Sequence, residues 1–119
     1  MHSFKDLKIW QRSMDLAKVV YETTANFPSN EKYGLTSQIN RAAVSVPSNI
    51  AEGAGRNSTK EFAQFLSIAL GSAFELETQL ILAHSFGLIS KASLESILQQ
   101  LEQIQKMIYG FKNSILKKI

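Results

Sequence analysis

Residues 94–115 read LESILQQLEQIQKMIYGFKNSI and decide the fold class. Apolar side chains recur three and four residues apart over three heptads, at Leu94, Ile97, Leu101, Ile104, Ile108, Phe111 and Ile115. This spacing puts them on one face of an α-helix that packs against other helices. Ser90 suits an N-cap, and Ile89 and Leu94 suit a hydrophobic staple. We therefore expect a helix over about residues 90–117.

The preceding stretch, residues 58–86, predicts a helix with clear signals at both ends. Ser58 and Glu61 form the pattern of a capping box, in which side chain and backbone bond reciprocally. Gly87 stands where a left-handed residue commonly follows a helix. The apolar seam between these signals consists of Phe62, Leu66, Ala69, Ala73, Leu76, Leu80 and Ala83.

Two further helices are expected, over about residues 6–26 and 30–54. The first has a seam of Leu7, Trp10, Met14, Ala17 and Tyr21, and the second has one of Leu35, Ile39, Ala42, Val46 and Ile50. Ser29 or Asn30 is the expected N-cap of the second helix. Pro47 lies inside that helix, where it removes a backbone hydrogen bond. Because the apolar stripe keeps its phase across Pro47, we expect a kinked helix.

Four helices with short connections predict an all-α fold, an antiparallel up-down-up-down four-helix bundle in one domain, residues 1–119. The last two helices carry more apolar residues than one seam requires. These additional residues are Phe65, Ile68, Leu70, Phe74 and Ile81 in the third helix, and Leu98, Met107, Tyr109 and Leu116 in the fourth. Such wide faces are equally consistent with a subunit interface and with a thick monomer core.

The composition is that of a globular protein in a reducing compartment. The chain has 119 residues, of which 45% are apolar, and no cysteine. It therefore has no disulfide framework, and its apolar content excludes a disordered protein. Residues 1–10 are too charged for a signal peptide, and no uninterrupted apolar run reaches the roughly 18 residues of a membrane span. We expect a cytoplasmic protein without membrane contact.

The sequence predicts no enzyme, catalytic residue, cofactor or metal. The histidines are His2 and His84, and His84 has no carboxylate three residues before it, as a metal-binding bundle motif would require. Glu75 and Glu77 are two residues apart, so they point in different directions on a helix. Cysteine is absent, and no serine stands in a nucleophile motif. The loop at residues 53–58 lacks the strand and the lysine of a phosphate-binding loop.

Basic residues suggest a polyanion as partner. The chain has 13 basic and 10 acidic residues, a net charge of +3. The candidates for phosphate contacts are Lys5, Lys8 and Arg12 on the first helix, Arg56 and Lys60 at the start of the third, and Lys117 and Lys118 at the C-terminal end. The competing interpretation is a solvated surface with favourable charge at the last helical turn.

Arg41 lies next to the small residues of the second helix, close to its seam. A half-buried arginine needs a carboxylate partner, for which Glu52, Glu75 and Glu77 are candidates. We therefore assign Arg41, Pro47, Glu75 and Glu77 structural or interface roles, and we favour an ion pair of Arg41 over an RNA contact.

Residues 33–53, YGLTSQINRAAVSVPSNIAEG, resemble the signature of the proteins encoded in intervening sequences of bacterial 23S rRNA genes. The similarity continues through the Gly55-Arg56 pair, residues 58–77 and the N-terminal Trp10, so it covers nearly the whole chain. Asn40 departs from the family pattern, which commonly has a basic residue there. This departure weakens any argument for a strong positive patch on the second helix.

The resemblance implies a four-helix bundle that assembles into a closed ring, typically a homopentamer. The accessory variability proteins of diversity-generating retroelements look like relatives, and those are basic rings that bind a reverse transcriptase and its template RNA. We therefore expect a non-enzymatic, homo-oligomeric, RNA-associated protein whose phosphate contacts carry no sequence readout. The alternative is a scaffold ring that recruits a protein partner such as a reverse transcriptase without binding RNA directly.

Overall fold

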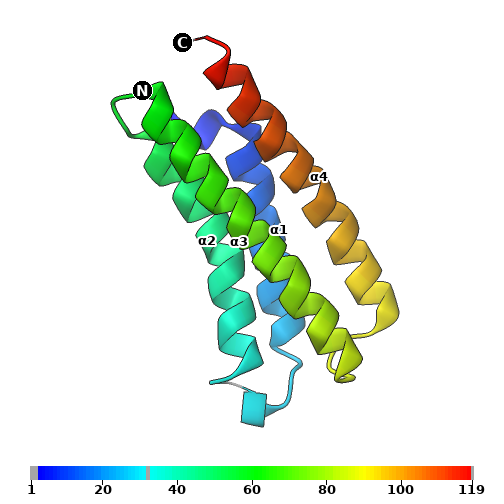
Figure 1. The fold of residues 1–119 in the computed structure, drawn as a ribbon. Coiled ribbons are helices and arrows are strands. Elements are labelled where there is room, and N and C mark those ends of the chain that lie inside the picture. The colour runs from blue at the N-terminus through cyan, green and yellow to red at the C-terminus, as the bar shows by residue number, and fades with distance from the viewer. Residues whose placement is uncertain (1–2, 32, 119) are drawn as a thin grey trace.

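Four long helices packed around one hydrophobic core make up the molecule (Figure 1). The computed structural model describes residues 3–31 and 33–118. Its helices are α1 (Lys8–Thr24), α2 (Leu35–Ala54), α3 (Thr59–Ser85) and α4 (Lys91–Leu116), with 3₁₀ turns η1 (Phe4–Asp6) and η2 (Ser29–Glu31). The described residues contain no β-strand. The prediction of an all-α four-helix bundle is confirmed.

The helices form a rod of 47 × 23 × 20 Å. Contacts join α2 to both α1 and α3, and α4 to both α3 and α1. The start of α1, the α2–α3 connection and the end of α4 lie together at one end of the rod (Figure 1). We call this end, made of residues 3–12, 52–61 and 112–118, the terminal end. The turn η2 and the α3–α4 connection lie at the opposite end.

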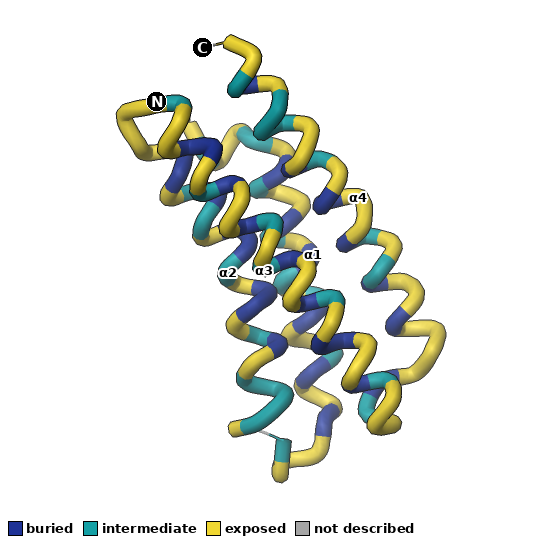
Figure 2. Tube along the Cα trace, in the orientation of Figure 1, coloured by how far each residue is buried: buried dark blue, intermediate teal, exposed yellow. Residues whose placement is uncertain are grey.

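The predicted seams of α2, α3 and α4 form the core. All seven seam residues of α3 are buried. Every seam residue of α2 and α4 is buried except Leu35 and Phe111, which are half-buried and pack against the core. Figure 2 shows these buried positions turned toward the neighbouring helices. The helical spacing of apolar residues therefore identified the core of these three helices correctly.

The predicted seam of α1 does not coincide with the fully buried face of the helix, although Leu7, Trp10 and Ala17 are half-buried and pack against the core. The buried residues of α1 are Ile9, Ser13, Leu16, Val20 and Thr24, whereas Trp10, Met14, Ala17 and Tyr21 line a surface groove. The helix carries two adjacent apolar stripes. The stripe that faces the core contains Ser13 and Thr24, so it looks less apolar in the sequence. Both hydroxyls are satisfied, because Ser13 Oγ donates to Ile9 O at 2.6 Å and Thr24 Oγ1 donates to Asn40 Oδ1 at 2.9 Å.

The predicted caps of α3 and α4 are confirmed. Ser58 Oγ accepts from the Glu61 amide and donates to Glu61 Oε1, both at 3.1 Å, and Ser90 Oγ accepts from the Ser93 amide at 3.1 Å. Gly87 has φ of +77°. The amide of Leu88 donates to Ala83 O at 2.9 Å and that of Gly87 to His84 O at 3.0 Å. These two bonds form a Schellman motif, which ends α3.

The N-terminal bounds of α1 and α2 differ from prediction. The backbone at Leu7 is extended, so α1 begins at Lys8 after η1. The expectation that Ser29 or Asn30 caps α2 is wrong, because both residues lie in η2. Helix α2 begins at Leu35, and its first amide donates to Glu31 Oε1 at 3.4 Å. A carboxylate on the preceding turn thus replaces the expected cap.

Pro47 is buried inside α2, which runs without interruption from Leu35 to Ala54. Proline lacks an amide hydrogen, so the Ala43 carbonyl has no partner at that position of the helix. Neighbouring contacts hold the helix together across this gap: Ser45 Oγ and Ser72 Oγ lie 2.8 Å apart, and Asn49 Nδ2 donates to Ser45 O at 2.8 Å. The kink expected at Pro47 stays a prediction.

Helix α3 exposes several large apolar side chains. Ile68, Phe74 and Ile81 are 52%, 51% and 47% exposed. The thick-core interpretation of the wide face is therefore wrong for these residues, whereas Leu98, Met107 and Leu116 of α4 do pack against the core. By length and composition α3 is apolar enough to cross a membrane, but the core helix of a soluble bundle passes the same test. The expectation of no membrane contact stays a prediction.

Gly53 lets α2 approach α3 closely, and an alanine there is expected to destabilise the bundle. A Cβ at Gly53 would lie 2.6 Å from Phe65 Cβ and 3.0 Å from Phe62 Cδ1. We expect Gly53→Ala to lower the free energy of unfolding by about 1–3 kcal/mol. Gly110→Ala is the control, because a Cβ there meets nothing within 4 Å and should stabilise α4 by about 0.5–1 kcal/mol. Urea denaturation measures both, and equal effects would contradict the close approach.

Candidate nucleic-acid interface

The fold gathers basic residues from distant parts of the chain at the terminal end. Residues 3–12, 52–61 and 112–118 contain eight basic and three acidic residues, an excess of five positive charges. The other described residues contain four basic and seven acidic ones, an excess of three negative charges. All seven residues predicted to contact phosphates, Lys5, Lys8, Arg12, Arg56, Lys60, Lys117 and Lys118, lie in the terminal end. The net charge of the chain is small, but positive charge is concentrated at the terminal end and negative charge in the rest of the described residues.

Five of the six lysines of this end are exposed, and Lys112 is half-buried. Lys5, Lys8, Lys60, Lys117 and Lys118 are exposed. Within residues 3–31 and 33–118, none of them lies within 4.0 Å of a carboxylate. Lys5 Nζ lies 6.0 Å from the centroid of the Phe4 ring. These ammonium groups can therefore meet an external anion without first breaking an ion pair.

The two arginines of the terminal end are held by neighbouring side chains. Arg56 Nη2 lies 3.6 Å from Glu52 Oε1 in an exposed pair, and its guanidinium lies over the Phe65 ring at 4.7 Å. Arg12 Nη1 donates weakly to Gln103 Oε1 at 3.5 Å. An exposed ion pair contributes little energy, but stacking on a ring orients a guanidinium. These two contacts position the Arg56 side chain at the α2–α3 connection.

Two lysines stand at helix N-termini, where the helix dipole disfavours positive charge. Lys8 is the first residue of α1, whose first turn has no acidic residue, and Lys60 is the second residue of α3, whose first turn also contains Glu61. Each such placement costs about 0.3–1 kcal/mol at low salt. A bound phosphate would offset the repulsion between the lysine charge and the positive end of the helix dipole. Helix N-termini bind such anions through their unpaired amides. The terminal end is therefore electrostatically suited to phosphates.

Arg41 does not make the ion pair expected within the chain. It is exposed, and no carboxylate of the described residues lies within 4.0 Å of it. The expected half-buried position is wrong, because Arg41 lies at the rim between α2 and α3 and not on the core face. Arg41, Gln38, Glu75 and Gln79 line a cleft of about 410 Å³, which we call the α2–α3 cleft. An ion pair of Arg41 with another subunit stays a prediction.

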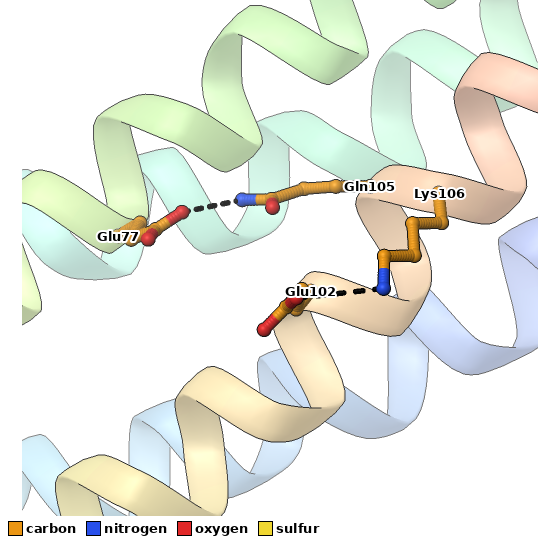
Figure 3. A network of polar contacts seen from close by, with 4 residues as sticks. All are labelled: Glu77, Glu102, Gln105 and Lys106. Carbon is orange, nitrogen blue, oxygen red and sulfur yellow. Dashed lines mark hydrogen bonds and ion pairs between the residues drawn. The ribbon is translucent and has the colours of Figure 1, made fainter.

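Glu77 joins α3 to α4 through Gln105, a residue that the sequence analysis did not select. Gln105 is 8% exposed, and its Nε2 donates to Glu77 Oε1 at 2.8 Å (Figure 3). The nearby pair of Lys106 with Glu102 lies within α4, at 3.5 Å in the solvent. Gln105 follows a core residue in the heptad pattern and could have been noticed only as a polar residue beside the seam.

A surface groove with a mostly apolar lining lies between α1 and α2. It is lined by Trp10, Met14, Ala17 and Tyr21 of α1 and by Val44, Pro47 and Ala51 of α2, and encloses about 500 Å³. We call it the α1–α2 groove. Sequence reasoning missed it, because the same α1 residues had been assigned to the core. The described residues contain no cluster of histidine or acidic side chains that could hold a metal ion, and His2 lies outside the described residues.

Comparisons with known proteins agree on one family. The sequence matches the model of the 23S rRNA-intervening sequence proteins over residues 5–110. Among solved structures, a protein of unknown function from the S23 ribosomal protein family of Bacteroides thetaiotaomicron superimposes with a TM-score of 0.79 and 26% sequence identity. The alignment covers 87% of this chain and 97% of that one. No curated protein matches the sequence.

Replacing Glu77 is expected to destabilise the contact between α3 and α4. Glu77→Ala leaves the buried Gln105 amide without its acceptor, which should lower the free energy of unfolding by about 1–3 kcal/mol. Glu102→Ala on the same side of α4 removes only an exposed ion pair and should cost at most about 0.5 kcal/mol. Urea denaturation of both variants checks the difference. Equal losses would mean that the interhelical bond contributes no more than a surface pair.

Proposed function

The chain belongs to the family of 23S rRNA-intervening sequence proteins, and we propose that it is a non-enzymatic protein that binds RNA through phosphate contacts at the terminal end. One observation carries this proposal: eight basic residues from three separate segments meet three acidic ones there. A surface with this excess of charge attracts polyanions. The family is named for intervening sequences of 23S rRNA. We therefore propose RNA as the polyanion that binds here.

The expected mechanism is electrostatic and largely independent of sequence. Lysine ammonium groups that approach phosphates release the counterions condensed on the nucleic acid, so affinity falls steeply with salt. Lys5, Lys8, Lys60, Lys117 and Lys118 are exposed ammonium groups of the terminal end, and Arg56 offers a guanidinium oriented by the Phe65 ring. Contacts of this kind position a protein on a nucleic acid without reading its bases.

We further propose that the protein acts as a homo-oligomer, as the resemblance to ring-forming proteins implies. The exposed side chains of Phe74 and Ile81, which lie seven residues apart on one face of α3, support this, because an exposed apolar face is a common site of self-association. Assembly would repeat the terminal end in every subunit, and weak contacts that act together bind much more tightly than one alone. A homopentamer in the bacterial cytoplasm is the specific form that we propose.

A protein-binding scaffold is the second candidate, and the α1–α2 groove favours it. Its lining of Trp10, Met14 and Val44 is apolar, and its volume of about 500 Å³ can accept side chains of a partner helix. A reverse transcriptase, as bound by the accessory proteins of retroelements, is the partner that this alternative implies. Apolar contacts tolerate salt, whereas phosphate contacts do not. Salt dependence therefore separates the two functions.

Charge reversal at the terminal end is expected to weaken RNA binding for all sequences alike. We expect the double variant Lys8→Glu with Lys60→Glu to lower the slope of log K against log salt by about 0.7–0.9 per lost phosphate contact. Fluorescence anisotropy of a labelled structured RNA over a salt series measures this, with a DNA duplex for comparison. The matched control is Lys18→Glu with Lys91→Glu, which changes the charge equally outside the terminal end and should retain most of the affinity.

Two outcomes would contradict the RNA proposal. Absence of binding at low salt would exclude RNA as a direct partner and favour the scaffold. A larger effect of the control variant would move the interface away from the terminal end. Circular dichroism of both variants establishes whether the fold is retained.

Glutamate on the exposed face of α3 is expected to dissociate the oligomer. Phe74→Glu and Ile81→Glu each place a charge on a surface that self-association would bury, at a cost of several kcal/mol. Size-exclusion chromatography with light scattering should then show the mass falling from a multiple of 13.3 kDa to that of one chain. Gln99→Glu on the exposed face of α4 is the control. A wild-type protein with the mass of a single chain would overturn the homo-oligomer.

A further inference from the structure

The α2–α3 cleft is a polar concavity that the proposed phosphate contacts do not use. It is lined by one cation, Arg41, one anion, Glu75, and the carboxamides of Gln38 and Gln79. Its character is the opposite of the α1–α2 groove, although α2 forms a wall of both. Such a concentration of hydrogen-bonding groups around about 410 Å³ suits a small polar ligand or one group of a larger one.

The groups that line this cleft retain hydrogen-bonding capacity. Gln79 is 8% exposed, and its Oε1 has no hydrogen-bond partner among the described residues. Arg41 and Glu75 line the same cleft, yet their charged atoms do not lie within the 4.0 Å of an ion pair. A buried carboxamide without a partner is unfavourable. A group inserted between Arg41 and Glu75 could bond to both.

The charges of the cleft restrict the chemistry of that group. A phosphate would meet the Glu75 carboxylate, and an apolar side chain would remove four polar residues from water without satisfying them. A neutral, planar group with several donors and acceptors on its edges satisfies both charges. Guanine is such a group: O6 and N7 accept from an arginine fork, and N1–H and the N2 amino group can donate to a carboxylate.

We propose that the α2–α3 cleft binds one unpaired guanine base of the RNA. Arg41 donates to O6 and N7, Glu75 accepts from N1–H and the N2 amino group, and Gln38 and Gln79 supply the remaining hydrogen bonds. The inference rests on the proposed function and deepens it, because phosphate contacts at the terminal end carry no sequence information. Single-stranded segments expose both base edges that this arrangement needs.

The position of the cleft is compatible with one strand that also reaches the terminal end. Arg41 and Arg56 are fifteen residues apart on or next to α2, which corresponds to about 22 Å along the helix axis. Polar side chains continue along the α2–α3 seam between them, where Ser45 and Ser72 are 2.8 Å apart and Asn49 Nδ2 lies 3.0 Å from Ser45 Oγ. A short single-stranded segment can span this distance.

The test compares three labelled single-stranded RNAs of equal length, uridine-rich and identical except for a central guanine, adenine or uracil. Wild-type protein should bind the guanine oligonucleotide roughly tenfold more tightly than the other two, the discrimination of one bidentate base contact. Glu75→Gln and Arg41→Gln should each abolish this preference and leave binding of the adenine oligonucleotide within about twofold. Glu95→Gln, an exposed carboxylate of α4, is the control and should retain the preference.

A second measurement examines the cleft independently of RNA binding. In ¹⁵N-labelled protein, guanosine monophosphate should shift the side-chain amide resonances of Gln38 and Gln79. Adenosine monophosphate carries the same phosphate and should shift them much less. The Glu75→Gln variant should lose the response to guanosine monophosphate, with an unchanged urea midpoint to show that the fold is intact.

The outcomes separate failure of the cleft from failure of the proposed function. Equal, salt-dependent binding of all three oligonucleotides overturns the guanine site and leaves phosphate binding in place. A guanine preference that survives Glu75→Gln also overturns it. If RNA does not bind at all, the proposed function fails, and unchanged Gln79 resonances with guanosine monophosphate then overturn the cleft as well. Dissociation of the oligomer by Arg41→Gln, without a nucleotide response, would overturn it by assigning Arg41 to a subunit contact.

Discussion

The close contact between α2 and α3 is the constraint on which the rest of the structure depends. At Gly53 the backbones approach so closely that a single methyl group would collide with Phe65 and Phe62. Small residues of these helices, such as Ala42, Ala69 and Ala73, are buried in the core. The hydroxyls of Ser45 on α2 and Ser72 on α3 form a hydrogen bond between the two helices. Dispersion contacts between close-packed backbones and side chains hold such a pair together. The pair in turn positions Arg56 against Phe65.

This constraint gives α2 two chemically different sides. Toward α1 it forms an apolar groove with Pro47 in the wall, and toward α3 it forms a polar cleft that contains Arg41. The apolar side suits a protein contact, since burial of such surface from water is favourable and tolerates salt. The polar side suits a ligand with matched donors and acceptors. One helix therefore separates an apolar concavity from a polar one, and α3 adds exposed apolar side chains at Ile68, Phe74 and Ile81.

The charge distribution follows from the same arrangement. The described chain begins and ends at the terminal end, and the α2–α3 connection lies there too, so basic residues far apart in sequence share one surface. Two of them, Lys8 and Lys60, stand where the helix dipole opposes a positive charge. The RNA binding that we propose would bring phosphate groups to these two residues.

The sequence by itself determined the number and type of the helices, the seams of α2, α3 and α4, and the caps at Ser58, Ser90 and Gly87. These features depend on periodicity and on hydrogen bonds between residues that are near in sequence. It also carried the family resemblance, from which the expectation of RNA association came.

Only the tertiary structure decided which of two adjacent stripes of α1 is buried, because satisfied hydroxyls at Ser13 and Thr24 face the core in place of apolar groups. It alone placed Arg41 in a cleft, joined Gln105 to Glu77 and collected the basic residues at one end. Those arrangements depend on contacts and charges between segments far apart in the chain, which no local pattern specifies.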